Sequence, residues 1–366
     1  INEKIASLRM VRAAHEGNMR RFKRYSEFIY GKPSQEIFEY TVGSVRARAE
    51  QSLGSDNEDL VLAAQELLAS LPEYSKPAET GLPSQETFNY AQEQTKREFH
   101  DIIDIPKFKG KLTGEDLRLA FEVALDKLRM SIATGGNWKA VTDTKLGIRT
   151  PVTNQQKQEV QTPETIGVSY TLLKELIVHE PGTHGLRRKN GERTKLMLLG
   201  IGLDRSEGGE EGVATMRQQV VGKDSLDEFA GLRYHMAAGF ALGNDGEPRD
   251  FRSVFEIMEK YHVYNYLCRG NDRVKSGRMA RNMAYSDCVR LFRGTDCGPG
   301  VVFTKDISYR ESNMGVWELV GTEEGQKELL RFSVGKYDPT NARHIWILDQ
   351  LGINEADLIE LDNDNT

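Results

Sequence analysis

The chain has 366 residues, of which 38% are hydrophobic and 28% charged, a balance typical of a soluble globular protein with one large or two ordinary domains. A formal net charge of −6 gives no overall attraction to nucleic acid, and no apolar run approaches the roughly 20 residues of a membrane span, so we expect neither partner. The three cysteines have no CxxC spacing, which argues against a disulfide framework or a cysteine-type zinc site and favours a reducing compartment such as the cytoplasm.

The start of the chain is predicted to be helical. Residues 1–68 divide into two or three helices, and the last of them covers Glu58–Leu68, where apolar residues recur at helical spacing. The stretch 1–32 holds eight Lys or Arg against three acidic residues. This excess indicates either a solvated helix face or a contact with an acidic partner, and both interpretations stay open.

A proline-rich stretch follows these helices. Residues 69–88 contain three prolines among Ser, Glu and Gly, a composition that predicts a surface connection. We therefore predict an N-terminal helical region with its linker over 1–88 and a second domain over 89–366.

The second domain is predicted to begin with a helix and short strands. Thr113 and Asp116 have the spacing of a helix cap, and the helix runs on to Leu128. Short strands are predicted at 138–141, 147–152 and 159–162. They would form a small sheet just before the next helix.

That next helix carries the side chains of a zinc site. It is predicted over Thr171–Glu180, and its end reads His179-Glu-Pro-Gly-Thr-His184. Two imidazoles and a carboxylate on adjoining turns are the groups that a zinc hydrolase uses. With seven His and 55 acidic residues in the chain, a chance His-acid-x-x-x-His run is expected only about 0.02 times.

The spacing of the two histidines sets a condition on the backbone. Zincins usually carry His-Glu-x-x-His, but His184 follows His179 by five residues. On a straight helix these residues would be about 140° apart, so a shared metal requires a wider, π-type turn. Pro181 and Gly182 favour such a deformation. The alternative is a helix that ends at Pro181, with His184 in the following loop.

Helices are predicted to dominate the rest of the chain. Lys195–Leu203 is expected to be an apolar strand or buried segment, and Val301–Tyr309 a strand or a strand that leads into a helix. The expected fold is thus α+β, mostly helical, with a small mixed or antiparallel sheet next to a zincin-like active-site helix. The predicted helices cover Glu210–Val220, about 251–268, about 272–293 and about 325–352.

A catalytic zinc requires a third protein ligand and one open position. The adjacent pair Glu210 and Glu211 offers two candidates at the start of a predicted helix. Their positions in the sequence do not decide between them.

Four motifs follow one another in the sequence. They are His-Glu-Pro-Gly-Thr-His-Gly-Leu-Arg187, Glu-Glu-Gly-Val-Ala214, Arg290-Leu-Phe-Arg-Gly294 and Phe303-Thr-Lys-Asp306. Together they resemble the tyrosine metallocarboxypeptidase family, which includes microtubule-associated tyrosine carboxypeptidases and bacterial QEGLA-motif proteins. The hallmark of this family is an HExxxH helix followed by an acid-Gly-Leu-Ala motif. Two positions depart from it: Pro181 stands where the family usually has an aliphatic residue, and Val213 replaces Leu.

The resemblance implies a zinc-dependent metallocarboxypeptidase that removes a C-terminal residue, Tyr- or Phe-like, from a peptide or protein. In this scheme His179, His184 and Glu211 bind Zn²⁺. Glu180 is the general base that takes a proton from the zinc-bound water and returns it to the leaving amine.

A carboxypeptidase also needs a cation for the free carboxylate of its substrate. The candidates are Arg187, Arg188, Arg293 and Lys305, and we favour Lys305 and Arg293 because they belong to the family-like motifs. Tyr309 is a possible hydrogen-bond donor to the substrate. For each of them, a structural or surface ion pair is the alternative.

Two other functions remain open. One is a regulatory or interaction protein that binds the metal without peptidase turnover, and the other is an aminopeptidase or endopeptidase. The sequence indicates neither the oligomeric state nor the physiological substrate.

Overall fold

The computed structural model describes residues 2–74, 81–144, 148, 150–354 and 356–357. The chain forms two compact units, each assembled from two separate stretches of sequence. Unit 1 consists of Ile1–Gly81 and Ala230–Glu311, and unit 2 of Leu82–Phe229 and Ser312–Thr366. The division into sequential domains at 1–88 and 89–366 stays a prediction, because compactness alone does not show which stretches fold independently. Residues 75–80 of the predicted linker lie outside the described residues.

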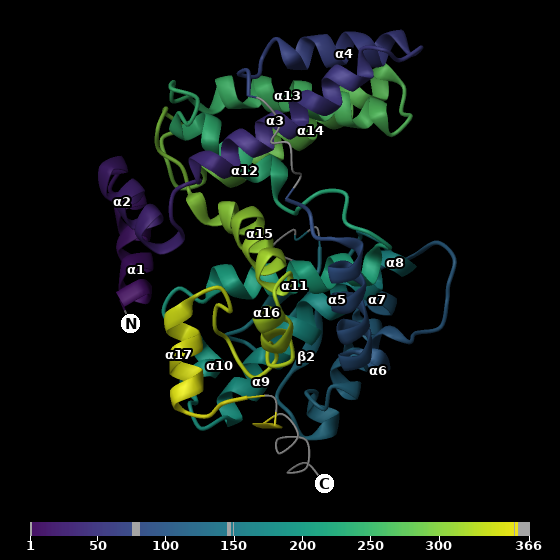
Figure 1. Ribbon diagram of the computed structural model, residues 1–366, viewed down its shortest axis with the longest axis vertical. Coiled ribbons are helices and arrows are strands. Elements are labelled where there is room, and N and C mark those ends of the chain that lie inside the picture. Colours follow the sequence, from purple (N-terminus) through teal and green to yellow (C-terminus); the bar gives the residue numbers. More distant parts are fainter. Residues whose placement is uncertain (1, 75–80, 145–147, 149, 355, 358–366) are drawn as a thin grey trace. The chain divides into compact units, whose positions relative to one another are not determined.

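All elements of regular secondary structure among the described residues of unit 1 are helices. Its core combines apolar side chains from five helices, and the edge of the Phe38 ring meets Phe240 at a centroid distance of 5.2 Å. Two long helices, α13 and α14, run side by side (Figure 1). The helices are α1 (Asn2–His15), α2 (Met19–Tyr30), α3 (Gln35–Ser52), α4 (Glu58–Leu68), α12 (Leu232–Leu242), α13 (Phe251–Cys268), α14 (Arg273–Phe292) and the 3-10 helix η3 (Thr304–Ile307).

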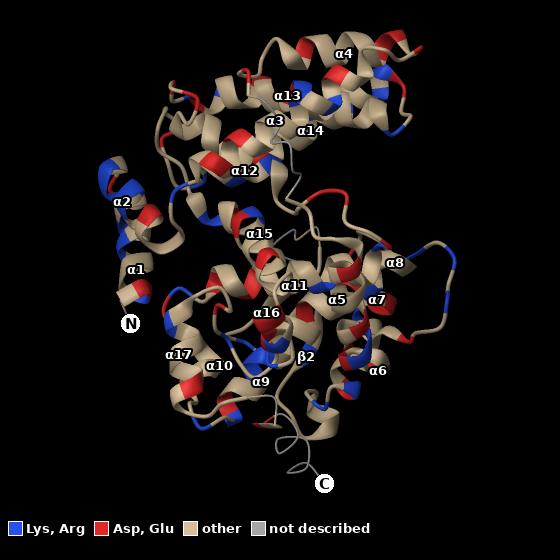
Figure 2. Cartoon of the chain, in the orientation of Figure 1, with Lys and Arg blue, Asp and Glu red and all other residues tan. Residues whose placement is uncertain are grey.

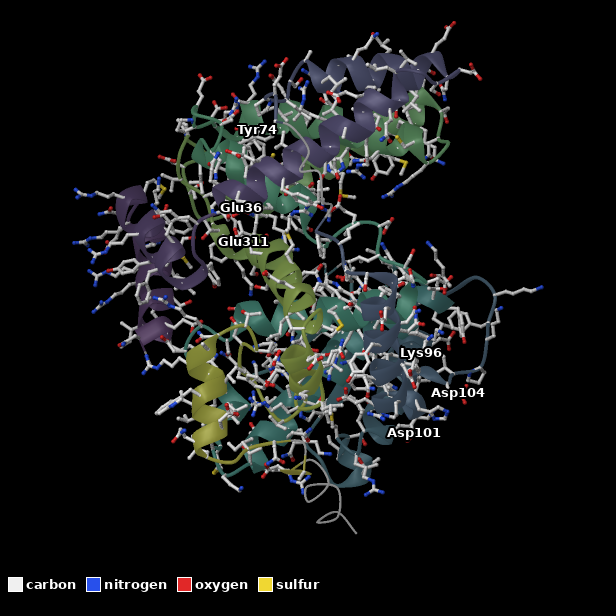
Figure 3. The ribbon with its side chains drawn as sticks, viewed as in Figure 1. Glu36, Tyr74, Lys96, Asp101, Asp104 and Glu311 are labelled. Atoms are coloured by element: carbon white, nitrogen blue, oxygen red, sulfur yellow. The ribbon has the colours of Figure 1, made fainter. Side chains whose placement is uncertain are left out.

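The first residues of α15 (Ser308–Val320) are fixed within unit 1 by a carboxylate. Glu311, labelled in Figure 3, accepts a hydrogen bond from the main-chain N–H of Ser34 (2.7 Å) and lies 2.9 Å from Nε2 of His235. These contacts join α15 to the N-terminus of α3 and to α12. His235 is fully buried, so its imidazole is part of the packing of this unit.

Basic residues gather on the first two helices. Figure 2 shows blue Lys and Arg segments along α1 and α2, as the charge count of 1–32 predicts. Ion pairs hold only some of them, such as Arg12 with Glu16 at 2.7 Å. Whether this face meets solvent or an acidic partner stays open.

The described part of unit 2 contains two small sheets. In the three-stranded sheet, β2 (Lys139–Asp143) is parallel to the central β4 (Glu159–Pro163), and β3 (Val152–Asn154) is antiparallel to it. The two-stranded sheet pairs β1 (Lys111–Leu112) with β5 (Val168–Ser169) in antiparallel orientation. Of the strand predicted at 147–152, residues 147 and 149 lie outside the described residues, and β3 begins only at Val152.

The predicted α+β class, mostly helical with a small mixed sheet, is confirmed. The apolar face of α8 (Leu173, Leu176, Ile177 and Val178) is buried, and α8 packs against α11. The helices of unit 2 besides α15 are α5 (Gln85–Glu98), α6 (His100–Ile103), α7 (Gly114–Lys127), α8 (Tyr170–His179), the π-helical η2 (Glu180–Gly185), α9 (Leu186–Arg193), α10 (Leu198–Ile201), α11 (Glu207–Gly222), α16 (Glu323–Leu329) and α17 (Ala342–Gln350). No helix within the described ranges combines the length and the apolar character that a membrane crossing needs.

Three predicted elements differ from the structure. Lys195–Leu203 forms no strand; it contains the short helix α10, which buries Leu199 but leaves Leu198 and Ile201 exposed. Val301–Tyr309 is also no strand, because it leads through η3 into α15. The helix predicted over about 325–352 is two helices, α16 and α17, separated by irregular chain.

Candidate metal centre

The backbone between the two histidines widens into a π turn. The N–H of Leu186 donates to the carbonyl of Pro181, five residues earlier, and η2 joins α8 directly to α9. The predicted π turn is therefore confirmed, and the alternative of a helix that ends at Pro181 is wrong. Gly182 is closely packed here, because a Cβ atom would lie 3.1 Å from the carbonyl oxygen of Ile177 and 3.3 Å from the Phe99 ring, so a larger residue would need its neighbours to shift slightly.

The π turn brings three possible ligand atoms together. Nε2 of His179 and Nε2 of His184 are 3.3 Å apart, and Oε2 of Glu211 lies 3.8 Å from the first and 3.7 Å from the second. Ligands at 2.0–2.1 Å from a tetrahedral zinc are about 3.3 Å from one another. The three atoms therefore fit one face of a zinc tetrahedron, with a slightly longer approach for the carboxylate.

The two adjacent acids of α11 lie on different sides of His184. Glu210 is the partner of the other ring nitrogen, because its Oε1 lies 2.8 Å from Nδ1 of His184. A proton on Nδ1 leaves Nε2 with its lone pair toward His179 and Glu211. This arrangement, a carboxylate behind a metal-binding imidazole, is common in zinc sites. The geometry thus favours Glu211 over Glu210 as a ligand.

Glu180 lies beside the same cluster. Its side chain is buried, and Oε1 is 4.0 Å from Nε2 of His179. A carboxylate next to the metal position can accept a proton from a water molecule there. This position is compatible with the general-base role that the family resemblance implies for Glu180, and that role stays a prediction.

The two histidines have opposite pKa shifts. Burial lowers the pKa of His179 to about 4, and the neighbouring His184 adds to this effect. Burial also disfavours the charged form of His184, but Glu211 and the hydrogen bond to Glu210 outweigh it and raise the pKa of His184 to about 9. Burial would raise the pKa of Glu210, yet the charge of Lys336 and the contact with His184 lower it. In the metal-free site His184 is therefore in its positively charged form, with a proton on each ring nitrogen, at neutral pH.

A family model described as microtubule-associated tyrosine carboxypeptidase matches residues 156–356, more than half of the chain. The chain belongs to this family. Membership indicates a carboxypeptidase, and therefore an enzyme, and it confirms the resemblance inferred from the four motifs. No curated protein matches the chain.

Arg187, one of the predicted substrate cations of this tyrosine carboxypeptidase family member, is fully buried. Its Nε and Nη2 donate to the carbonyl oxygens of Gly335 and Tyr337, both at 2.7 Å. The guanidinium also lies 5.1 Å from the centre of the Tyr337 ring. This geometry gives Arg187 a packing role and does not support the prediction that it binds substrate.

The predicted substrate residues Lys305, Arg293 and Tyr309 belong to unit 1, whereas the histidine cluster belongs to unit 2. The Arg293 guanidinium lies 4.4 Å from the centre of the Phe303 ring and 3.8 Å from a carboxylate oxygen of Asp306. Lys305 lies in η3, and the hydroxyl of Tyr309 is 3.5 Å from Nη2 of Arg290. Their roles in carboxylate binding stay predictions.

Two polar residues beside the candidate metal centre were not predicted from the sequence. Gln155, just after β3, donates from Nε2 to Oε1 of Glu210 at 3.0 Å. Lys336, between α16 and α17, places Nζ 2.9 Å from Oε2 of the same carboxylate. Neither belongs to a motif, and each is far from Glu210 in sequence, so no local pattern indicates them.

Proposed function

We propose that this chain is a zinc-dependent metallocarboxypeptidase that removes a C-terminal Tyr- or Phe-like residue from a protein substrate. The observation that carries the proposal is the approach of His179, His184 and Glu211 to one another beside Glu180, in a member of a carboxypeptidase family. The family description supports tyrosine as the released residue and a microtubule protein as the substrate.

Each residue has a distinct task in the proposed reaction. Zn²⁺ held by His179, His184 and Glu211 would acidify a water molecule and polarise the scissile carbonyl. Glu180 accepts the proton of that water and passes it to the amine that leaves. A cation from the family-like motifs, Lys305 or Arg293, pairs with the terminal carboxylate of the substrate and so selects the end of the chain.

The test combines metal content with peptide cleavage. We expect about one zinc per purified chain and release of the last residue from peptides ending in Tyr or Phe. Peptides with an amidated end should be poor substrates, whereas equal cleavage of both would indicate an endopeptidase or aminopeptidase.

Substitutions separate the roles. Glu180→Gln should keep zinc and lose cleavage, whereas Glu256→Gln on α13, an exposed acid paired with Arg252 at 3.0 Å, is the control with full activity. Glu211→Ala should lower the zinc content. Zinc binding without any peptide turnover would instead favour a regulatory or interaction protein, and retained cleavage in Glu180→Gln would contradict its role as base.

A further inference from the structure

The carboxylate of Glu210 is the centre of a buried polar network behind His184. The residue is 3% exposed, yet three groups contact its two oxygens. Oε1 lies 2.8 Å from Nδ1 of His184 and accepts from Nε2 of Gln155 at 3.0 Å, while Oε2 lies 2.9 Å from Nζ of Lys336. Each oxygen has its own partners, so the plane of the carboxylate is fixed.

Lys336 is brought to this place by a tightly bound main chain. Its own N–H donates to the carbonyl of Leu199 at 2.7 Å, and its carbonyl accepts from the N–H of Leu203 at 3.0 Å. On either side, the carbonyls of Gly335 and Tyr337 accept from the buried guanidinium of Arg187. The backbone at Lys336 is therefore tied to α9 and α10, the helices that follow the π turn.

The position of Lys336 is not that of an ordinary surface ion pair. Its side chain is 13% exposed and that of Glu210 is 4% exposed. Removing both charges from water is costly, and buried ion pairs seldom add much net stability for that reason. Orientation is the better explanation, since a carboxylate behind a metal-binding imidazole sets the direction of the ring.

We propose that Lys336 is a positioning residue of the metal centre. By holding Oε2 of Glu210, it directs Oε1 at Nδ1 of His184 and so keeps the Nε2 lone pair of that ring aimed at the metal position. This inference rests on the proposed function, because it assumes that His184 is a zinc ligand.

The test is the zinc affinity of the full chain, measured by competition with a chelator. Lys336→Met should weaken zinc binding by about 10- to 100-fold, the usual effect of losing an outer partner of a metal ligand. Lys223→Met is the matched control, because that lysine pairs with Asp227 at the exposed surface, and its zinc affinity should be unchanged. Unchanged or tighter binding by Lys336→Met would overturn the inference.

A second variant separates positioning from folding. Lys336→Met leaves a buried carboxylate without its cation, which destabilises the fold. Glu210→Gln keeps an oxygen acceptor for His184 without the charge, so in this background Lys336→Met should change zinc affinity by less than about threefold, following double-mutant logic. A loss of about tenfold or more in this background would show that Lys336 does not act through Glu210. This outcome would overturn the inference even if the single variant fails to fold.

A spectrum provides a readout that a purely structural role would not change. With Co²⁺ as the probe, the visible absorption of folded Lys336→Met should differ in shape from that of the unsubstituted chain, because His184 is reoriented. An identical spectrum would count against positioning. Failure of the proposed function looks different: the unsubstituted chain would then bind no zinc, or bind it and cleave no peptide.

Discussion

The hydroxyl of Thr183 donates a hydrogen bond to the main-chain carbonyl of Val178, which is 2.9 Å away and five residues earlier in the chain. The same oxygen lies 3.4 Å from Nη1 of Arg217, which donates to it from α11. One buried hydroxyl therefore connects the π turn with the last turn of α8 and with α11, the helix that carries Glu211.

Thr183→Val tests this hydroxyl. The change keeps the shape of the side chain but removes both hydrogen bonds in a buried place, so we expect the free energy of unfolding to fall by about 1–3 kcal/mol. Urea unfolding of chelator-treated protein measures it. Thr183→Ser keeps the hydroxyl and should lose less; equal losses in the two variants would contradict the explanation.

Gly212→Ala should disturb both stability and metal binding. A Cβ atom at this position would lie 2.5 Å from the carbonyl oxygen of Ser312 on α15, so α11 would have to shift along with Glu211. We expect a loss of about 1–3 kcal/mol in unfolding free energy, together with weaker zinc binding. Gly277→Ala is the control, because that helical glycine has open space around it and alanine there should stabilise by up to about 1 kcal/mol. Similar effects of both changes would show that the contact with α15 is unimportant.

Zinc binding should depend on pH through His184. Its pKa is raised to about 9, so the metal-free folded protein holds this proton below pH 9 and must release it when zinc binds. His179, with a pKa lowered to about 4, is already neutral. Because one proton must leave His184, we expect the affinity for zinc to rise by about tenfold per pH unit from neutral pH to about pH 9. Calorimetry at pH 7.5 in buffers of different ionisation enthalpy should find release of about one proton per zinc, and no release would contradict the protonated state.

Arg217→Met should be strongly destabilising. Its Nη2 lies 2.6 Å from a carboxylate oxygen of Glu98 and 2.9 Å from the hydroxyl of Ser333, with the arginine side chain only 2% exposed. Loss of one partner of such a pair costs about 3 kcal/mol. Arg12→Met, at an exposed ion pair with Glu16, should cost less than about 0.5 kcal/mol. Comparable urea midpoints for the two variants would contradict the expectation that the buried arginine contributes more stability than the exposed one.

Helices with local signals could be predicted from the sequence. The prediction at 251–268 coincides with α13, because its apolar spacing and its N-cap are local features of the sequence. The Asp250 side chain, directly before the helix, accepts a hydrogen bond from the N–H of Ser253 at 2.8 Å. The Lys195–Leu203 prediction failed because an apolar run was taken as buried, whereas Leu198 is 58% and Ile201 67% exposed.

Some residues of the candidate site could be predicted from the sequence, and others could not. His179, Glu180 and His184 share one run, which the sequence shows directly. Glu211 lies on α11, beyond α9 and α10, and only the family resemblance distinguishes it from Glu210 in the sequence. Gln155 and Lys336 reach Glu210 only through the tertiary fold, since their places depend on main-chain contacts such as that of Lys336 with Leu199. No periodicity or motif encodes such contacts.

The order of the chain has a consequence for how the centre is completed during synthesis. The three possible zinc ligands have all been made once Glu211 is added, but Lys336, the cation beside Glu210, follows more than a hundred residues later. At translation rates of about 5–20 residues per second, the nascent chain carries the ligands for roughly 6–25 s before Lys336 is added. Complete assembly of the centre therefore waits until the segment between α16 and α17 has left the ribosome and can fold onto α9 and α10.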